Sequence, residues 1–179
     1  APADPADLAR MTKLLERRGP DGTGHWHEGA VALGHTLLAT TPESLHETLP
    51  LRHAETGCVI TADVRLDNRP ELLEALGARQ RLGEAGDGRL LLEAYLRWGE
   101  ACVDHLLGDF AFAIWDPRRQ RLFCVRDHMG MRQLIYHHTP GRLFAFATEP
   151  RAVLQVAGVP RRLNEVRIGD YLANMETAD

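Results

Sequence analysis

The chain has 179 residues, of which 44% are hydrophobic, and a formal net charge of −4 at neutral pH. This length suits one domain, or one domain with a tail, and the apolar content can form a sizeable core. With no basic excess, nucleic acid and membrane surfaces are excluded as main partners, and no apolar run approaches the roughly 20 residues that span a bilayer. Three cysteines without a Cys-x-x-Cys pair predict reduced thiols in a cytoplasmic protein.

The first third of the chain predicts a helix followed by a hairpin. Asp4 suits the N-cap of the helix and Pro5 its first position. Gly19 favours a left-handed end to the helix. Residues 24–38 then alternate in the manner of two strands that turn at Glu28-Gly29.

The middle of the chain predicts a strand and two helices. Residues 58–62 form a short apolar strand that ends in the polar segment 63–69, and a helix follows that is capped by Asp67 or Asn68. A stronger helix covers residues 89–98, and Asp87 is suited to cap it.

The apolar segment 107–116 and the segment 121–127 predict the central hairpin of the fold. Phe110, Phe112 and Ile114 fall on one face of the first strand, whereas Ala111, Ala113 and Trp115 fall on the other. Both faces are apolar, which is typical of a central strand covered on both sides. Four further segments complete the predicted elements: strands at 134–138 and 143–147, and helices at 150–157 and 165–174.

This order of elements indicates the fold class. Successive hairpins favour largely antiparallel sheets, and the helices between them can lie on the outer faces. The sequence therefore predicts an α+β fold rather than a doubly wound parallel sheet.

Four motifs occur in an order that resembles a known family. They are Arg18-Gly19-Pro20-Asp21-Gly22, Leu107-Gly108-Asp109-Phe110-Ala111-Phe112-Ala113, Arg126-Asp127-x-x-Gly130 and Phe144-Ala145-Phe146-Ala147-Thr148-Glu149. From about Met11 to Arg151 the chain resembles the N-terminal class II glutamine amidotransferase (glutaminase) domain of B-type asparagine synthetases. The resemblance implies an N-terminal-nucleophile fold, a four-layer αββα sandwich with two mainly antiparallel sheets. It also implies a glutaminase-like domain over residues 1–160 whose first strand is absent from this sequence, and a helix and linker at 161–179 leading to a C-terminal synthetase domain.

The resemblance also implies a catalytic cysteine at the mature N-terminus, which this sequence lacks because it begins at Ala1. The family's oxyanion-hole segment Asn-Gly-Glu aligns with Asp63-Val64-Arg65, so a carboxylate stands where negative charge must be stabilised. Val64 replaces the glycine that lets substrate approach the backbone, and Arg65 replaces a carboxylate. Only Asp87 matches the position that holds the glutamine amine. We therefore expect a vestigial glutamine pocket and no catalytic residue.

A narrower resemblance points to peptide natural-product enzymes. Thr41-Pro42-Glu43-Ser44-Leu45 and residues 62–69 are similar to segments of lasso-peptide macrolactam cyclases and, more distantly, of β-lactam synthetases. These relatives imply a C-terminal domain that uses ATP and Mg²⁺ to adenylate a carboxylate, which an amine then attacks. The Ser-Gly-Gly-x-Asp-Ser loop of that domain is absent here, so no cofactor is expected in this chain. The implied partners are the synthetase domain, a precursor peptide with its leader-processing proteins, and a second copy.

Two alternatives remain open at this point. The chain is a working glutamine-hydrolysing domain if a cysteine segment precedes Ala1, or a free-standing binding domain if no synthetase domain follows Asp179.

Other polar signals have ordinary structural interpretations. We interpret Arg126-Asp127 as an ion pair that holds the following loop, and His25-x-His27 as exposed strand residues rather than metal ligands.

Overall fold

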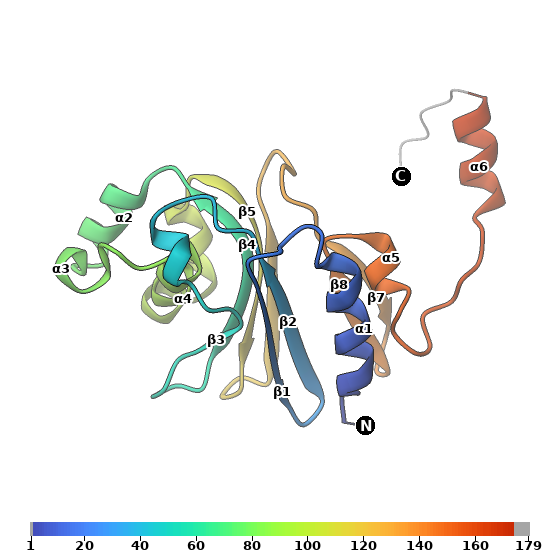
Figure 1. Ribbon diagram of the computed structural model, residues 1–179, viewed down its shortest axis with the longest axis horizontal. Coiled ribbons are helices and arrows are strands. Elements are labelled where there is room, and N and C mark those ends of the chain that lie inside the picture. Colours follow the sequence, from blue (N-terminus) through green and yellow to red (C-terminus); the bar gives the residue numbers. More distant parts are fainter. Residues whose placement is uncertain (1, 174–179) are drawn as a thin grey trace.

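The computed structural model describes residues 2–173, whose elements form four layers (Figure 1). In chain order the elements are α1 (Pro5–Leu15), β1 (Gly22–Glu28), β2 (Val31–Leu37), the 3₁₀ helix η1 (Glu43–His46), β3 (Leu51–Arg52), β4 (Val59–Leu66), α2 (Arg69–Ala75), α3 (Arg79–Leu82), α4 (Asp87–Trp98), the 3₁₀ helix η2 (Gly99–His105), β5 (Gly108–Asp116), β6 (Arg121–Arg126), β7 (Ile135–Thr139), β8 (Leu143–Ala147), α5 (Pro150–Val153) and α6 (Glu165–Leu172).

The main sheet is antiparallel and has the strand order β3-β4-β5-β6. Strand β5 lies in the middle, as its two apolar faces predict. Phe110, Phe112 and Ile114 join the hydrophobic core on the face covered by α4, and Ala113 on the opposite face is also fully buried. Asp116 ends the strand and accepts a hydrogen bond from the Arg118 N–H, which is the turn chemistry expected of Asp-Pro.

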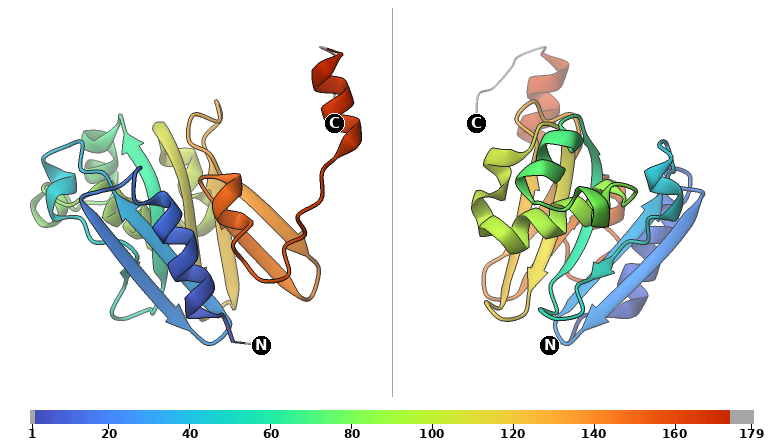
Figure 2. Two further views of the ribbon diagram at one scale, coloured as in Figure 1. Left: turned by 45° about the vertical axis from the view of Figure 1, so that its right-hand side comes forward. Right: turned by 90° about the vertical axis from the view of Figure 1, so that its left-hand side faces the viewer.

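The second layer of strands consists of two separate hairpins, β1-β2 and β7-β8. Helix α1 contacts β2 and α5, and α5 contacts both β7 and β8, so these two helices form the outermost layer over the hairpins. Figure 2 shows the same arrangement from two further directions. The predicted antiparallel αββα arrangement is confirmed, but within residues 2–173 the layer expected to be a second sheet is divided into two hairpins.

Several predicted elements begin or end elsewhere. Strand β4 extends beyond the predicted residues 58–62 to Leu66, because its last residues pair with the start of β5. Helix α4 begins at Asp87 with Gly86 as its N-cap, so Asp87 is not the capping residue. The helix predicted at 150–157 ends at Val153, and residues 174–179 of the helix and linker expected at 161–179 lie outside the described residues.

Side chains near the starts of α1 and α2 bind the following partners. Asp4 caps α1 as expected, and the Asp7 carboxylate pairs with Arg10 and accepts the Ala157 N–H. Asn68 stands at the N-cap of α2 but makes no capping bond, because its side chain binds the backbone of His105 and Leu107. Among residues 2–173, no helix is long and apolar enough to cross a membrane.

Candidate functional site

The candidate site lies at the C-terminal end of β4, where Asp63, Val64 and Arg65 follow one another. Thr61 on the same strand donates a hydrogen bond to the Gly34 carbonyl of β2, so odd-numbered residues of β4 face the hairpin layer. Asp63 and Arg65 therefore face that layer. Val64 faces the opposite side and packs against the core under α4. Its side chain therefore lies on the face opposite to Asp63 and Arg65.

Asp63 is paired with an arginine from a distant part of the chain. Arg132, in the loop between β6 and β7, places its Nη1 atom 3.3 Å from Asp63 Oδ1, and both side chains are about one-third exposed. Arg65 is more exposed and pairs with Asp67 at 2.9 Å. An oxyanion is stabilised by hydrogen-bond donors aimed at it. The Asp63 carboxylate offers only acceptors, and its negative charge opposes that chemistry.

Asp87 lies next to these residues but is fully engaged. Its Oδ2 accepts the Leu66 N–H at 2.7 Å, and its Oδ1 pairs with Arg69. Arg69 also donates to the Ala85 carbonyl at 2.8 Å. The Asp87 carboxylate thus joins the start of α4 to the end of β4 and the start of α2.

The N-terminus of α4 also binds a carboxylate from this chain. Glu47, just beyond η1, accepts the Gly88 N–H at 2.7 Å. Burial raises the pKa of Glu47 above its usual value, while the Gly88 N–H acts in the opposite direction. A Cβ atom on Gly86 or on Gly88 would lie within 3 Å of the Glu47 carboxylate. The anion site that this helix end offers is therefore taken by Glu47.

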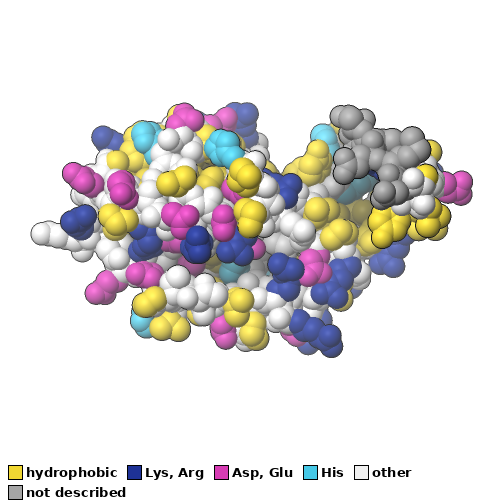
Figure 3. Space-filling model, turned by 90° about the horizontal axis from the view of Figure 1, so that it is seen from above, with side chains coloured by type: hydrophobic (Ala, Val, Ile, Leu, Met, Phe, Trp, Pro, Cys, Tyr) yellow, Lys and Arg dark blue, Asp and Glu magenta, His cyan; other side chains and the backbone are white. Residues whose placement is uncertain are grey.

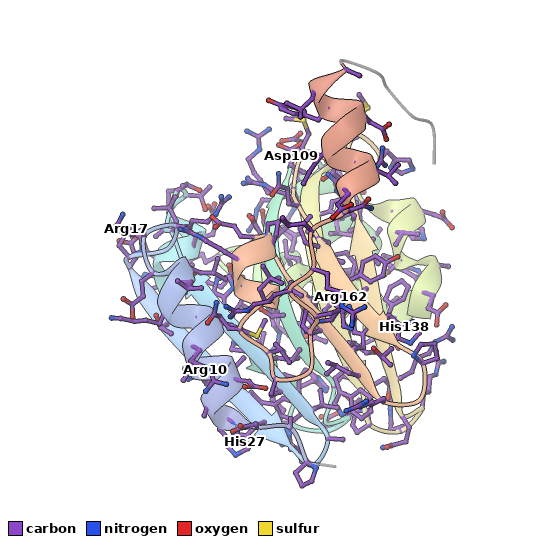
Figure 4. The ribbon with its side chains drawn as sticks, turned by 90° about the vertical axis from the view of Figure 1, so that its right-hand side faces the viewer. Arg10, Arg17, His27, Asp109, His138 and Arg162 are labelled. Carbon is purple, nitrogen blue, oxygen red and sulfur yellow. The ribbon has the colours of Figure 1, made fainter. Side chains whose placement is uncertain are left out.

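The family motif at residues 107–113 begins at the same end of the molecule. Gly108 adopts φ +142°, and a Cβ there would lie 2.1 Å from the Arg65 carbonyl oxygen, so only glycine lets β5 approach β4 this closely. Asp109 pairs in register with Arg65 and lies at the α6 end of the molecule, whereas His27 lies at the opposite end (Figure 4).

Arg126 and Asp127 hold the β6–β7 loop, as interpreted, but not by pairing with each other. Arg126 donates to the carbonyls of Arg132 and Gly130, and Asp127 accepts the N–H groups of Phe110, Met131 and Arg132. Burial acts to raise the Asp127 pKa, but these N–H groups outweigh it and hold the pKa below its usual value.

The motif at 18–21 joins the hairpin layer to the outer helices. Arg18 pairs with Glu149 at 3.2 Å, and Glu149 also pairs with Arg151 at the start of α5. The buried Gly19 leaves no room for a Cβ against the Thr36 backbone, Pro20 is exposed beside it, and Asp21 accepts the Ala39 N–H at 2.8 Å. These residues have structural roles.

His35 and Cys124 are partly buried, and desolvation shifts the pKa of each side chain. Burial lowers the pKa of His35 on β2 to about 4 and raises that of Cys124 on β6 to about 11. A raised thiol pKa leaves little thiolate at neutral pH, so Cys124 is a poor nucleophile. Residues 2–173 contain no cluster of three or more His, Cys, Asp or Glu side chains suited to a metal ion.

The structure therefore brings the four predicted pocket positions together at one strand end. Sequence reasoning missed Arg132, Arg69 and Glu47, which bind or neutralise the groups at this end. Arg69 had a weak signal, since it opens a predicted helix beside Asn68. For Arg132 and Glu47 the sequence carries no such signal, because their partners are distant in the chain and are reached only through folding.

Comparison with known proteins gives consistent results. A family model described as a glutamine amidotransferase domain matches residues 2–179. Glutamine-hydrolyzing asparagine synthetase 3 of Bacillus subtilis (strain 168) is 34% identical over 165 residues, which cover 91% of this chain and 27% of that protein. Glutamine-hydrolyzing asparagine synthetase B of Escherichia coli (strain K12) is 26% identical over 162 residues, covering 90% of this chain and 28% of that protein.

A solved structure supports the fold. Glutamine phosphoribosylpyrophosphate amidotransferase from B. subtilis, complexed with ADP and GMP, superposes with a TM-score of 0.68 at 19% identity, covering 84% of this chain and 40% of that one. The chain spans about a quarter of the length of the two asparagine synthetases. From the family model and these relatives, the chain belongs to the glutamine amidotransferase domains of the asparagine synthetase family.

Proposed function

We propose that this chain is a degenerate glutaminase-like domain of an ATP-dependent, amide-forming ligase related to asparagine synthetases, and specifically of a lasso-peptide macrolactam cyclase. The observation that carries the proposal is the state of the two carboxylates at the glutamine pocket. Asp63 is neutralised by Arg132, and Asp87 is engaged by Arg69 and the Leu66 N–H.

These contacts leave little for glutamine to bind. A substrate amine would have to compete with Arg69 for Asp87, whose side chain is only 12% exposed. At Asp63 a carboxylate stands where an oxyanion would need a donor, and the Arg132 guanidinium beside it is already paired with that carboxylate. The contacts of Asp87 hold the end of β4 and the starts of α2 and α4 together. This arrangement favours a scaffold role over hydrolysis.

The chemistry of the ligase would belong to the part of the polypeptide that follows. The relatives are about four times as long as the matched segment, which supports a C-terminal synthetase domain in the same protein. That domain would bind ATP and Mg²⁺ and adenylate a peptide carboxylate. A substrate amine would then displace AMP and close a macrolactam ring.

The test measures two reactions of the full-length protein. We expect no ammonia release from glutamine above a no-enzyme background, and ATP–pyrophosphate exchange that depends on the precursor peptide carboxylate. The B. subtilis asparagine synthetase serves as a positive control for the glutamine assay. Ammonia release at a rate comparable to that control would overturn the degenerate state, and exchange driven by aspartate instead of a peptide would overturn the cyclase role.

A second candidate, a working glutamine-hydrolysing domain, is favoured by one feature of the fold. The layer that contains β1-β2 and β7-β8 is divided in two within residues 2–173, which leaves strand edges for a further strand supplied by the protein. If that strand lies upstream of Ala1 and starts with cysteine, it would bring a nucleophile to the layer that Asp63 faces. The sequence upstream of Ala1 and the ammonia assay together distinguish this candidate from the first.

A further inference from the structure

An open pocket, here called the α2–α3 pocket, lies where helix α2 meets helix α3. Its volume is about 630 Å³, within the range of roughly 300–1,000 Å³ typical of sites for small ligands. The lining residues are Leu73, Glu74, Gly77, Arg79, Gln80 and Arg81. In Figure 1, α2 and α3 lie at the opposite side of the molecule from α6. The length of α2, about 10 Å, separates the pocket from Arg69 and the candidate glutamine site.

The turn between the two helices has a well-defined shape. The Gly77 N–H donates to the Glu74 carbonyl at 2.9 Å. The Ala78 N–H donates to the Leu73 carbonyl at 3.0 Å, which completes a Schellman cap at the end of α2. Gly77 has the positive φ, +62°, that this cap requires. Because Leu73, Ala78 and Leu82 are buried in the core, the polar side chains of the pocket project from an anchored frame.

Arg81 is held at the pocket by a carboxylate on α4. Its two Nη atoms donate to the two carboxylate oxygens of Glu93, at 3.0 and 3.2 Å. Arg89 also pairs with Glu93, at 2.7 Å. One carboxylate is therefore shared by two guanidinium groups, so this trio keeps an excess of positive charge beside the pocket.

Two exposed charged side chains of the pocket have no ionic partner in the part of the chain that the structure describes. They are Arg79, from α3, and Glu74, from α2. A guanidinium presents a planar fork of N–H donors that matches a carboxylate, whereas a carboxylate accepts hydrogen bonds from an ammonium group. Figure 3 views the molecule from above and shows cationic and anionic side chains close together on the side that carries α2.

We propose that the α2–α3 pocket binds a zwitterion derived from amino acids, with Arg79 and Arg81 binding its carboxylate and Glu74 its ammonium group. A free amino acid or a short peptide supplies this chemistry. The negative charge of Glu74 disfavours a phosphate, which carries no cationic group to offset it. The inference goes beyond the proposed function, because it assigns a binding site away from the glutamine pocket and does not depend on the reaction of the ligase.

The test is isothermal titration calorimetry of the full-length protein at neutral pH and low ionic strength. Glycine and triglycine are the two zwitterions, and inorganic phosphate is the competing anion. Triglycine amide lacks the carboxylate, and N-acetyl-triglycine lacks the ammonium group. The variants are Arg79→Gln and Glu74→Gln. Arg97→Gln is the matched control, because it removes an exposed arginine of α4 that does not line the pocket.

We expect a zwitterion to bind the wild-type protein with a dissociation constant of about 1 mM or less. Arg79→Gln should weaken this binding about tenfold or more, which is the usual effect of losing a hydrogen bond between charged groups. Loss of the carboxylate in triglycine amide should have a similar effect. Glu74→Gln should weaken binding of triglycine but not of N-acetyl-triglycine, and Arg97→Gln should bind as the wild type does. The tighter of glycine and triglycine identifies the source of the zwitterion.

Three results would overturn the proposal. The first is no saturable binding of either zwitterion to the wild-type protein. The second is equal affinity of the wild type and Arg79→Gln, which would place the ligand elsewhere in the protein. The third is tighter binding of phosphate than of both zwitterions, which would contradict the ligand class. Thermal unfolding confirms that each variant is folded, so that a loss of binding reports on the pocket.

Discussion

The Asp63 carboxylate and the Arg132 guanidinium lie 3.3 Å apart and join the end of β4 to the β6–β7 loop. Asp63 is the position at which the resemblance to glutaminases predicts an uncharged donor. Both side chains are about one-third exposed, so water screens their attraction.

We expect Asp63→Asn to change the free energy of unfolding by less than about 1 kcal/mol, because exposed ion pairs contribute little. The same variant should leave ammonia release from glutamine at background, since an amide at position 63 supplies a donor but no nucleophile. Urea unfolding and the ammonia assay on the full-length protein measure both effects. A double-mutant cycle with Arg132→Gln isolates the pair, and a coupling well above about 1 kcal/mol would contradict this account.

Asp87 should matter far more for stability. Asp87→Ala removes the carboxylate that binds the Arg69 guanidinium and the Leu66 N–H. The side chains of Asp87 and Arg69 are only 12% and 18% exposed, so water replaces the lost partner poorly. We expect a loss of about 2–4 kcal/mol in the free energy of unfolding. The matched control is Asp67→Ala, which removes the exposed pair with Arg65 and should cost under about 1 kcal/mol. Equal losses for the two variants in urea unfolding would refute the cross-linking role of Asp87.

His35 should make the domain sensitive to mild acid. Its pKa is about 4 in the folded protein, below the ordinary value of 6.5, because burial disfavours the imidazolium. As the pH falls, the His35 imidazole therefore takes up a proton in the unfolded chain before it does so in the folded protein. The contribution of His35 to the free energy of unfolding is fully present above pH 6.5 and is lost as the pH falls toward 4, by up to about 3 kcal/mol.

We expect His35→Gln to flatten this part of the stability profile, measured by urea unfolding at pH 7, 6, 5 and 4. His27→Gln, at an exposed position on the neighbouring strand β1, is the control and should follow the wild-type profile. A His35→Gln profile parallel to wild type would show that another group causes the acid sensitivity.

Gly108 should tolerate no side chain. In Gly108→Ala the new Cβ would lie 2.1 Å from the Arg65 carbonyl oxygen at a positive φ, so β5 would have to move from β4. We expect a loss of more than about 3 kcal/mol or failure to fold, which is the range of severe backbone conflicts. Gly141→Ala provides the comparison. Gly141 also has a positive φ, +69°, but a Cβ added there would meet no atom within 4 Å. This variant should therefore lose only the about 1–2 kcal/mol that a left-handed backbone conformation costs an L-residue. Similar thermal unfolding temperatures for the two variants would rule out the close approach as the cause.

Local patterns in the sequence were enough to identify the fold class and most of its elements. The apolar faces of residues 107–116 required a central strand, Asp4-Pro5 marked the start of α1, and Glu28-Gly29 marked a hairpin turn, because each depends on neighbouring residues alone. The order of four family motifs identified the family, which the comparisons confirm.

The state of the candidate site was decided only by tertiary structure. Asp87 was predicted to cap its own helix, yet folding brings it to Leu66 and Arg69, where a buried N–H and a guanidinium are stronger partners. Arg132 and Glu47 reach the site from loops whose positions depend on the packing of several elements. The sequence thus determined which residues are the candidates for a glutamine pocket, and the fold determined that their charges are engaged by partners from elsewhere in the chain.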